Sequence, residues 1–152
     1  LNGDQTGSIE ILNKLRDRRD AAVKGLNAID GIDISSEMVE IARGKYIYRN
    51  LECFNPDKGI PVKQNEYSII TAIGVISVGA APITIFDQVF DLLPQNGLFA
   101  FSFNEHSLVV PEYSLKVEQT VKEKKAEQLF CELGPHILKR DLKSMVYVIK
   151  KL

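Results

Sequence analysis

The sequence has few of the residues that mark specialised sites or compartments. Its 152 residues contain two cysteines, two histidines and no tryptophan. Cys53 and Cys131 lie far apart and outside any C-x-x-C pattern, so we expect neither a disulfide nor a metal site. We interpret both as small buried apolar residues in a reducing compartment. The expected location is therefore the cytoplasm, with targeting to an organelle left open.

Long hydrophobic runs and an excess of charge of one sign are also missing. No apolar run reaches the ~20 residues that a membrane-spanning helix needs, and the N-terminus lacks the basic-then-apolar pattern of a signal peptide. The net charge is −1, which gives no electrostatic reason to expect nucleic acid or an anionic membrane as a partner. A basic cluster at residues 14–19 contains its own acid and is interpreted as a solvated helix face.

What is present fits an ordinary soluble globular protein. Hydrophobic residues make up 45% of the chain and charged residues 26%, as in typical domains. The length suffices for one domain with a sizeable core, so we predict a single domain over residues 1–152. Because the chain begins with Leu1 rather than methionine, we expect a fragment or a processed form that lacks N-terminal elements.

Hydrophobic periodicity predicts helices and strands in alternation. Helical spacing of apolar residues is found over residues 8–24, 36–44, 82–93 and 111–125. Strands are expected over residues 26–33, 46–54, 69–78, 98–104, 126–133 and 143–151. The runs 69–75 and 98–103 are almost wholly apolar, so both should be nearly fully buried inner strands. The order predicts an α/β, Rossmann-like three-layer sandwich, with a mostly parallel sheet and an antiparallel last strand.

A single carboxylate stands where the strand over residues 26–33 ends and the next helix begins. Asp33 is followed by Ser35 and Ser36, either of which can cap that helix. In a doubly wound sheet, ligands bind outside the carboxyl ends of the strands. A carboxylate at that position can accept two hydrogen bonds from a ribose diol. The alternative is an acid that only stabilises the N-terminus of the helix.

Three segments, in this order, resemble class I S-adenosylmethionine-dependent methyltransferases: GIDISSEMVEIAR, GLFAFSFNEH, and GPH followed by SMVYVIKK. The resemblance extends over residues 3–152 and is greatest to small bacterial-type domains and to the methyltransferase-like 27 proteins. It implies S-adenosylmethionine as the cofactor. It also implies that Asp33 binds the ribose and that Ile34 and Met38 flank the adenosine.

The family's glycine-rich turn corresponds to residues 3–7, where the chain departs from the pattern. Gly3, Thr6 and Gly7 match, but Gln5 stands where a glycine is usual. The family's first strand is missing or short. Because a glutamine resists the positive φ that a glycine adopts, we expect weak or no cofactor binding in this chain. An upstream segment, the neighbouring strands or a partner chain should fill the gap left by the missing strand. A plain turn before a helix is the alternative interpretation.

The resemblance assigns further cofactor contacts at the ends of the later strands. Glu52 with Cys53 corresponds to an acid near the adenine, and Gly74 corresponds to a contact after the fourth strand. Ser68 stands where an acid is usual. No metal is implied.

Candidate catalytic residues follow the fourth and fifth strands: Ser77, Asn104, Glu105 and His106. Methyl transfer needs orientation and, for some acceptors, a base, but for each of these residues loop polarity or turn chemistry is the favoured explanation. A turn at residues 134–136 should lie at the same edge if the sixth strand is parallel to the others.

Three functions remain open from the sequence. The first is a methyltransferase acting on a small molecule or protein. The second is an inactive methyltransferase-like structural or binding subunit, favoured by Gln5, Ser68 and the missing strand. The third is a nicotinamide-binding domain, which would share Asp33 but lacks the G-x-G-x-x-G pattern.

Overall fold

The computed structural model describes residues 28–137 and 142–152. The chain divides into two compact units, Leu1–Gly59 and Ile60–Leu152. The glycine-rich turn with Gly3, Thr6 and Gly7, and the helix predicted over residues 8–24, lie outside the described residues. The single domain predicted over the whole chain stays a prediction.

The described part of the first unit is a parallel strand pair with its connecting helix. It consists of β1 (Asp30–Asp33), α2 (Ser36–Arg43), β2 (Asn50–Cys53) and a short 3₁₀ turn, η1 (Pro56–Lys58). The two strands pair in parallel, as the intervening helix requires. Ser35 caps α2 by accepting a hydrogen bond from the Met38 backbone N–H, and Gly44 is the C-cap. The helix and both of its caps therefore agree with the prediction.

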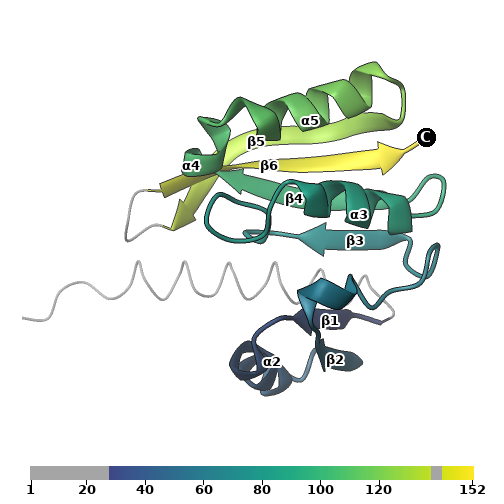
Figure 1. The fold of residues 1–152 in the computed structure, drawn as a ribbon, viewed down its shortest axis with the longest axis vertical. Coiled ribbons are helices and arrows are strands. Elements are labelled where there is room, and N and C mark those ends of the chain that lie inside the picture. The colour runs from purple at the N-terminus through teal and green to yellow at the C-terminus, as the bar shows by residue number, and fades with distance from the viewer. Residues whose placement is uncertain (1–27, 138–141) are drawn as a thin grey trace, which may run out of the picture. The chain divides into compact units, whose positions relative to one another are not determined.

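The second unit is a four-stranded sheet with helices (Figure 1). Its elements are β3 (Ile69–Ala72), α3 (Thr84–Leu92), β4 (Leu98–Asn104), α4 (Glu105–Leu108), α5 (Pro111–Lys122), β5 (Ala126–Ile137) and β6 (Leu142–Lys151). The strand order is β3-β4-β6-β5. β3 and β4 are parallel, and β6 is antiparallel to both of its neighbours. The predicted α/β class with an antiparallel last strand is confirmed.

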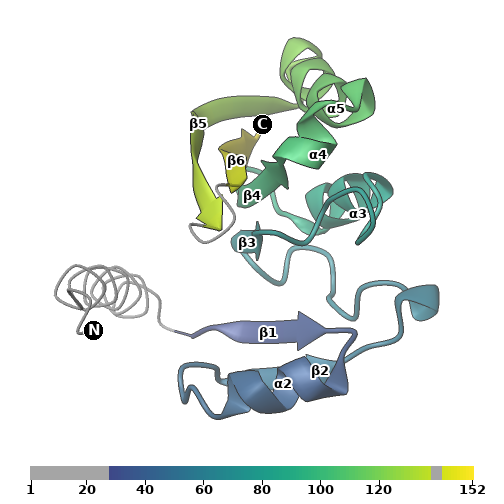
Figure 2. The same ribbon diagram turned by 90° about the vertical axis from the view of Figure 1, so that its left-hand side faces the viewer.

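Alternate residues of β4 build the core of the second unit. Phe99, Phe101 and Phe103 are fully buried, and they share one face because side chains alternate along a strand. α3 and α5 lie on that face (Figure 2). The ring of Phe86 from α3 meets that of Phe101 edge-on at 5.3 Å, and Tyr113 from α5 meets Phe103 at the same distance. The predicted burial of residues 98–103 is largely confirmed.

The prediction for residues 69–75 is wrong in two respects. β3 ends at Ala72, and the chain then turns. Ile69, Ile73 and Val75 are 42%, 53% and 45% exposed. Within the described residues β3 pairs only with β4, so it has one neighbour there instead of the two that were expected. A continuous apolar run is typical of a strand that is covered on both of its faces.

Both cysteines also differ from the prediction. Cys53 and Cys131 are exposed rather than buried. Cys53 ends β2, and Cys131 lies on β5, which is the last strand of its sheet. Strands with a single neighbour leave more of their side chains in contact with solvent.

Tyr147 should make the stability of the second unit depend on alkaline pH. Burial, assisted by the neighbouring Cys131, raises the pKa of Tyr147 from 10.0 to about 12. The unfolded chain therefore loses this proton at lower pH than the folded chain. We expect the free energy of unfolding to be insensitive to this group below about pH 10, and to fall by at most ~3 kcal/mol as the pH rises toward 12.

Urea unfolding at a series of pH values from 7 to 11 measures this dependence. Tyr147→Phe should flatten the decline above pH 10. The same decline in wild type and variant would show that another group is responsible.

Candidate functional site

In the first unit, the parallel pair brings the predicted residues to one edge. Asp33 lies opposite Cys53 in the strand register. The Cys53 thiol donates a hydrogen bond to the Ile34 carbonyl oxygen at 3.5 Å. Glu52 is exposed and lies opposite Ile32, one position earlier. The carboxyl ends of β1 and β2 therefore place Asp33, Ile34 and Cys53 beside one another.

The Asp33 carboxylate is only partly used by the protein. Its Oδ1 atom accepts a hydrogen bond from the Ser35 backbone N–H at 2.8 Å, which is the local helix-stabilising role. Oδ2 accepts none from the described residues. Because a carboxylate can accept about four hydrogen bonds, the half-buried side chain still has acceptor capacity for a diol. Ile34 and Met38 follow with exposed apolar side chains, and their role at the adenosine stays a prediction.

In the second unit, the segment after β3 is bonded to β4. Gly74 has φ +71°, a conformation that glycine adopts without strain. Its backbone N–H donates to the Ser102 hydroxyl at 2.9 Å. Ser102 is 1% exposed, so this contact is shielded from water. Gly74 is thus held at the carboxyl end of the strands, where the sequence places it.

Asn104 ends β4 and caps α4. Its Oδ1 atom accepts hydrogen bonds from both the backbone N–H and the hydroxyl of Ser107, each at 2.9 Å. The fully buried Ser107 hydroxyl in turn accepts from the Val78 backbone N–H at 3.1 Å. The Asn104 Nδ2 group has no acceptor among the described residues. The Asn104 side chain is therefore fixed through its oxygen, and its Nδ2 group remains as a hydrogen-bond donor.

The sequence did not lead us to predict α4, or the hydrogen bonds that Ser102 and Ser107 accept from Gly74 and Val78. The pattern N-x-x-S at residues 104–107 is a signal for a helix N-cap and would have indicated α4. Glu105 and His106 occupy its first turn, half-buried and exposed respectively. Ser77, in contrast, is buried.

The expected turn at residues 134–136 is wrong, because β5 continues to Ile137. These residues were expected at the ligand edge if the sixth strand in the family's count, which is β5 here, runs parallel to β4, and it does. β5 and β4 are each antiparallel to β6, so they run in the same direction. Ser144 of β6 lies opposite both Asn104 and Gly134. Gly134 therefore lies level with Asn104, two strands away.

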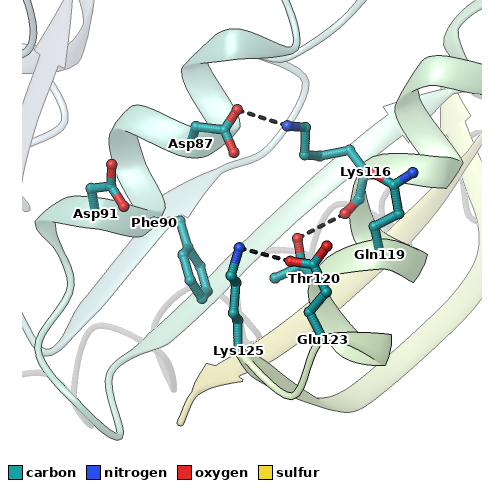
Figure 3. A pocket seen from close by; sticks show the side chains of 8 residues that line it. All are labelled: Asp87, Phe90, Asp91, Lys116, Gln119, Thr120, Glu123 and Lys125. Atoms are coloured by element: carbon teal, nitrogen blue, oxygen red, sulfur yellow. Dashed lines mark hydrogen bonds and ion pairs between the residues drawn. The ribbon is translucent and has the colours of Figure 1, made fainter.

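A pocket of about 290 Å³ lies between α3 and α5 (Figure 3). Its charges are largely satisfied by one another: Lys116 pairs with Asp87 at 2.8 Å and Lys125 with Glu123 at 2.7 Å. The second pair raises the pKa of Lys125 and lowers that of Glu123 through their mutual hydrogen bond. The pocket lies toward the C-terminal ends of these helices, so it is separate from the edge that carries Asn104.

Two other kinds of feature are not found among the described residues. In the part of the chain that the structure describes, no three His, Cys, Asp or Glu side chains are grouped as a metal ion would need. None of the helices described there is both long and apolar enough to cross a membrane.

No protein-family model and no curated protein sequence matches this chain. Its fold is similar to those of several solved structures. A SAM-dependent methyltransferase from Methanosarcina mazei shares 12% identity, with a TM-score of 0.59 over 89% of this chain and 86% of that one. The N-methyltransferase NodS from Bradyrhizobium japonicum, in complex with S-adenosyl-L-homocysteine, shares 9% identity with a TM-score of 0.56. The cyclase SpnF shares 13% identity with a TM-score of 0.57.

The extent of these similarities differs between the structures. The matches to NodS and SpnF each cover 82% of this chain but only 66% of the other. At such identities the likeness establishes the arrangement of helices and strands, and it agrees with the resemblance seen in the sequence. The chain therefore has the fold of the class I S-adenosylmethionine-dependent methyltransferases.

Proposed function

We propose that this protein is an S-adenosylmethionine-dependent methyltransferase that acts on a small-molecule or protein acceptor. The observation that carries the proposal is Asp33, which ends β1 with a carboxylate oxygen free of partners among the described residues. In this fold the carboxyl ends of the strands are the ligand edge. The fold alone does not decide the reaction, since SpnF is a cyclase.

The residues divide into two roles. Asp33 would accept hydrogen bonds from the ribose hydroxyls, with Ile34 and Met38 against the adenosine and Glu52 and Cys53 near the adenine. S-adenosylmethionine would supply the methyl group from its sulfonium sulfur. Asn104 would orient the acceptor, and Glu105 or His106 would take the proton that a hydroxyl or amine acceptor loses. Positioning of this kind is the main contribution of the protein to such a displacement.

Calorimetric titration of the chain with S-adenosylmethionine, S-adenosylhomocysteine and NAD tests the cofactor. We expect weak binding of the first two by wild type, because Gln5 occupies the glycine position, and clearly tighter binding by Gln5→Gly. NAD should not bind to either protein. Binding of NAD alone would refute the proposal, and micromolar binding of S-adenosylhomocysteine by wild type would refute the role given to Gln5.

A second candidate is an inactive methyltransferase-like subunit. It is favoured by the strand edges of the two units. Among the described residues, β1 pairs only with β2 and β3 only with β4, and edge strands are sites at which another chain can pair. This candidate predicts a stable complex with a partner chain together with no affinity for S-adenosylhomocysteine, even after Gln5→Gly.

A further inference from the structure

Between β3 and α3, five of the nine backbone N–H groups of residues 73–81, the loop considered below, donate hydrogen bonds within the protein. The N–H groups of Gly74 and Val78 donate to the buried hydroxyls of Ser102 and Ser107 at 2.9 and 3.1 Å. Three more N–H groups donate to carbonyl oxygens within the loop: Ser77 to Ala81, Ala80 to Ser77, and Ala81 to Val75. These amides are therefore unavailable to bind an anion, and the loop is anchored to β4 at two points.

What the loop presents to solvent is apolar. The side chains of Ile73, Val75 and Val78 are each about half exposed. From Ser68 to Phe86 the sequence contains no charged residue. A charged ligand placed against this loop would lose hydration without gaining a counter-charge from the loop itself, which is costly.

One polar group is held beside this apolar surface. The Ser107 hydroxyl contacts both the Val78 N–H and the Asn104 Oδ1 atom, so the Asn104 amide lies next to the loop. Because Oδ1 already accepts two hydrogen bonds, the group left for a ligand is the Nδ2 donor. A donor selects ligands that carry an acceptor oxygen or nitrogen.

We propose that this loop and Asn104 form the acceptor-binding surface, and that the acceptor is an uncharged, mainly apolar small molecule. An oxygen of that molecule accepts a hydrogen bond from Asn104 Nδ2, while its apolar part packs on Val75 and Val78. The assignment of this ligand as a methyl acceptor rests on the proposed function. Its chemical class follows from the loop and Asn104.

Three probes of similar size and different charge test the class: benzamide, benzoate and benzylammonium. Each is titrated into the full chain while NMR signals of the valine methyl groups and the Asn104 side-chain amide are followed. We expect benzamide to shift the signals of Val75, Val78 and Asn104, and to bind at least about tenfold more tightly than either charged probe, a difference of ~1.4 kcal/mol. Equal or tighter binding of a charged probe, or no shift at these residues, would overturn the proposal.

Two variants and a control sharpen the test. Val78→Asp places a carboxylate at an exposed position, so the fold should persist while the preference changes from benzamide to benzylammonium. Ser107→Ala should weaken benzamide binding severalfold by releasing both Asn104 and Val78. Thr120→Val removes another buried hydroxyl, one that bonds the Lys116 carbonyl within α5, and should leave benzamide binding unchanged. An unaltered preference in Val78→Asp would contradict the assigned surface.

Parallel titration with S-adenosylhomocysteine separates this inference from the proposed function. Benzamide binding in Gln5→Gly without any affinity for S-adenosylhomocysteine would refute the methyltransferase and leave the ligand class standing. Affinity for S-adenosylhomocysteine without benzamide binding at the loop would overturn this inference alone.

Discussion

Replacing Phe101 by alanine should lower the free energy of unfolding of the second unit by about 3–5 kcal/mol. The ring is fully buried. It contacts four other aromatic rings, those of Phe86, Phe99, Phe103 and Tyr147, with centroid distances from 4.7 to 5.3 Å. These neighbours come from β4, α3 and β6, so no single element can move to fill the space. The cost therefore includes the cavity as well as the lost burial.

Urea unfolding followed by circular dichroism measures this loss. Phe130→Ala provides the matched control, because Phe130 is the same residue type on β5 of the same sheet but is 39% exposed. It should cost far less, since much of its ring already contacts water. Similar losses in the two variants would mean that the β4 aromatic cluster is not the centre of the core.

Replacing Asp33 by alanine should weaken the binding of S-adenosylhomocysteine by about 1–3 kcal/mol, because the ribose hydroxyls lose a charged acceptor. Calorimetry in the Gln5→Gly background, where we expect measurable affinity, gives the comparison. Asp33→Asn should also weaken binding. Its amide oxygen can still accept from the Ser35 N–H, so that local turn should be kept.

The local hydrogen bond between Asp33 and Ser35 at the start of α2 needs a separate control. Ser35→Ala removes the hydroxyl that accepts from Met38 and should cost about 1 kcal/mol of stability. The Asp33 carboxylate remains in place, so the affinity should change little. An unchanged affinity in Asp33→Ala would remove this residue from the cofactor site, whatever happens to the stability of α2.

Local patterns predicted much of the fold. The apolar run at residues 98–103 identified a buried strand, and Ser35 and Gly44 delimited α2 to within a residue. These predictions succeed because side-chain periodicity and helix capping involve residues only a few positions apart. They do not reveal how many neighbours a strand has. For this reason the apolar run at residues 69–75 was expected to be buried, whereas Ile69 and Val75, on β3 and in the loop after it, are substantially exposed.

The candidate residues of the two units show the same division. The sequence by itself determined the position of Asp33: a strand, a carboxylate and a capped helix follow one another, and the Ser35 N–H bonds Asp33 only two residues away. Only the tertiary structure decided what the loop after β3 contacts. There Ser102 reaches Gly74 across 28 residues and Ser107 reaches Val78 across 29. The parallel pairing of β3 with β4 makes these contacts possible, because it brings the carboxyl ends of two strands distant in sequence to the same edge.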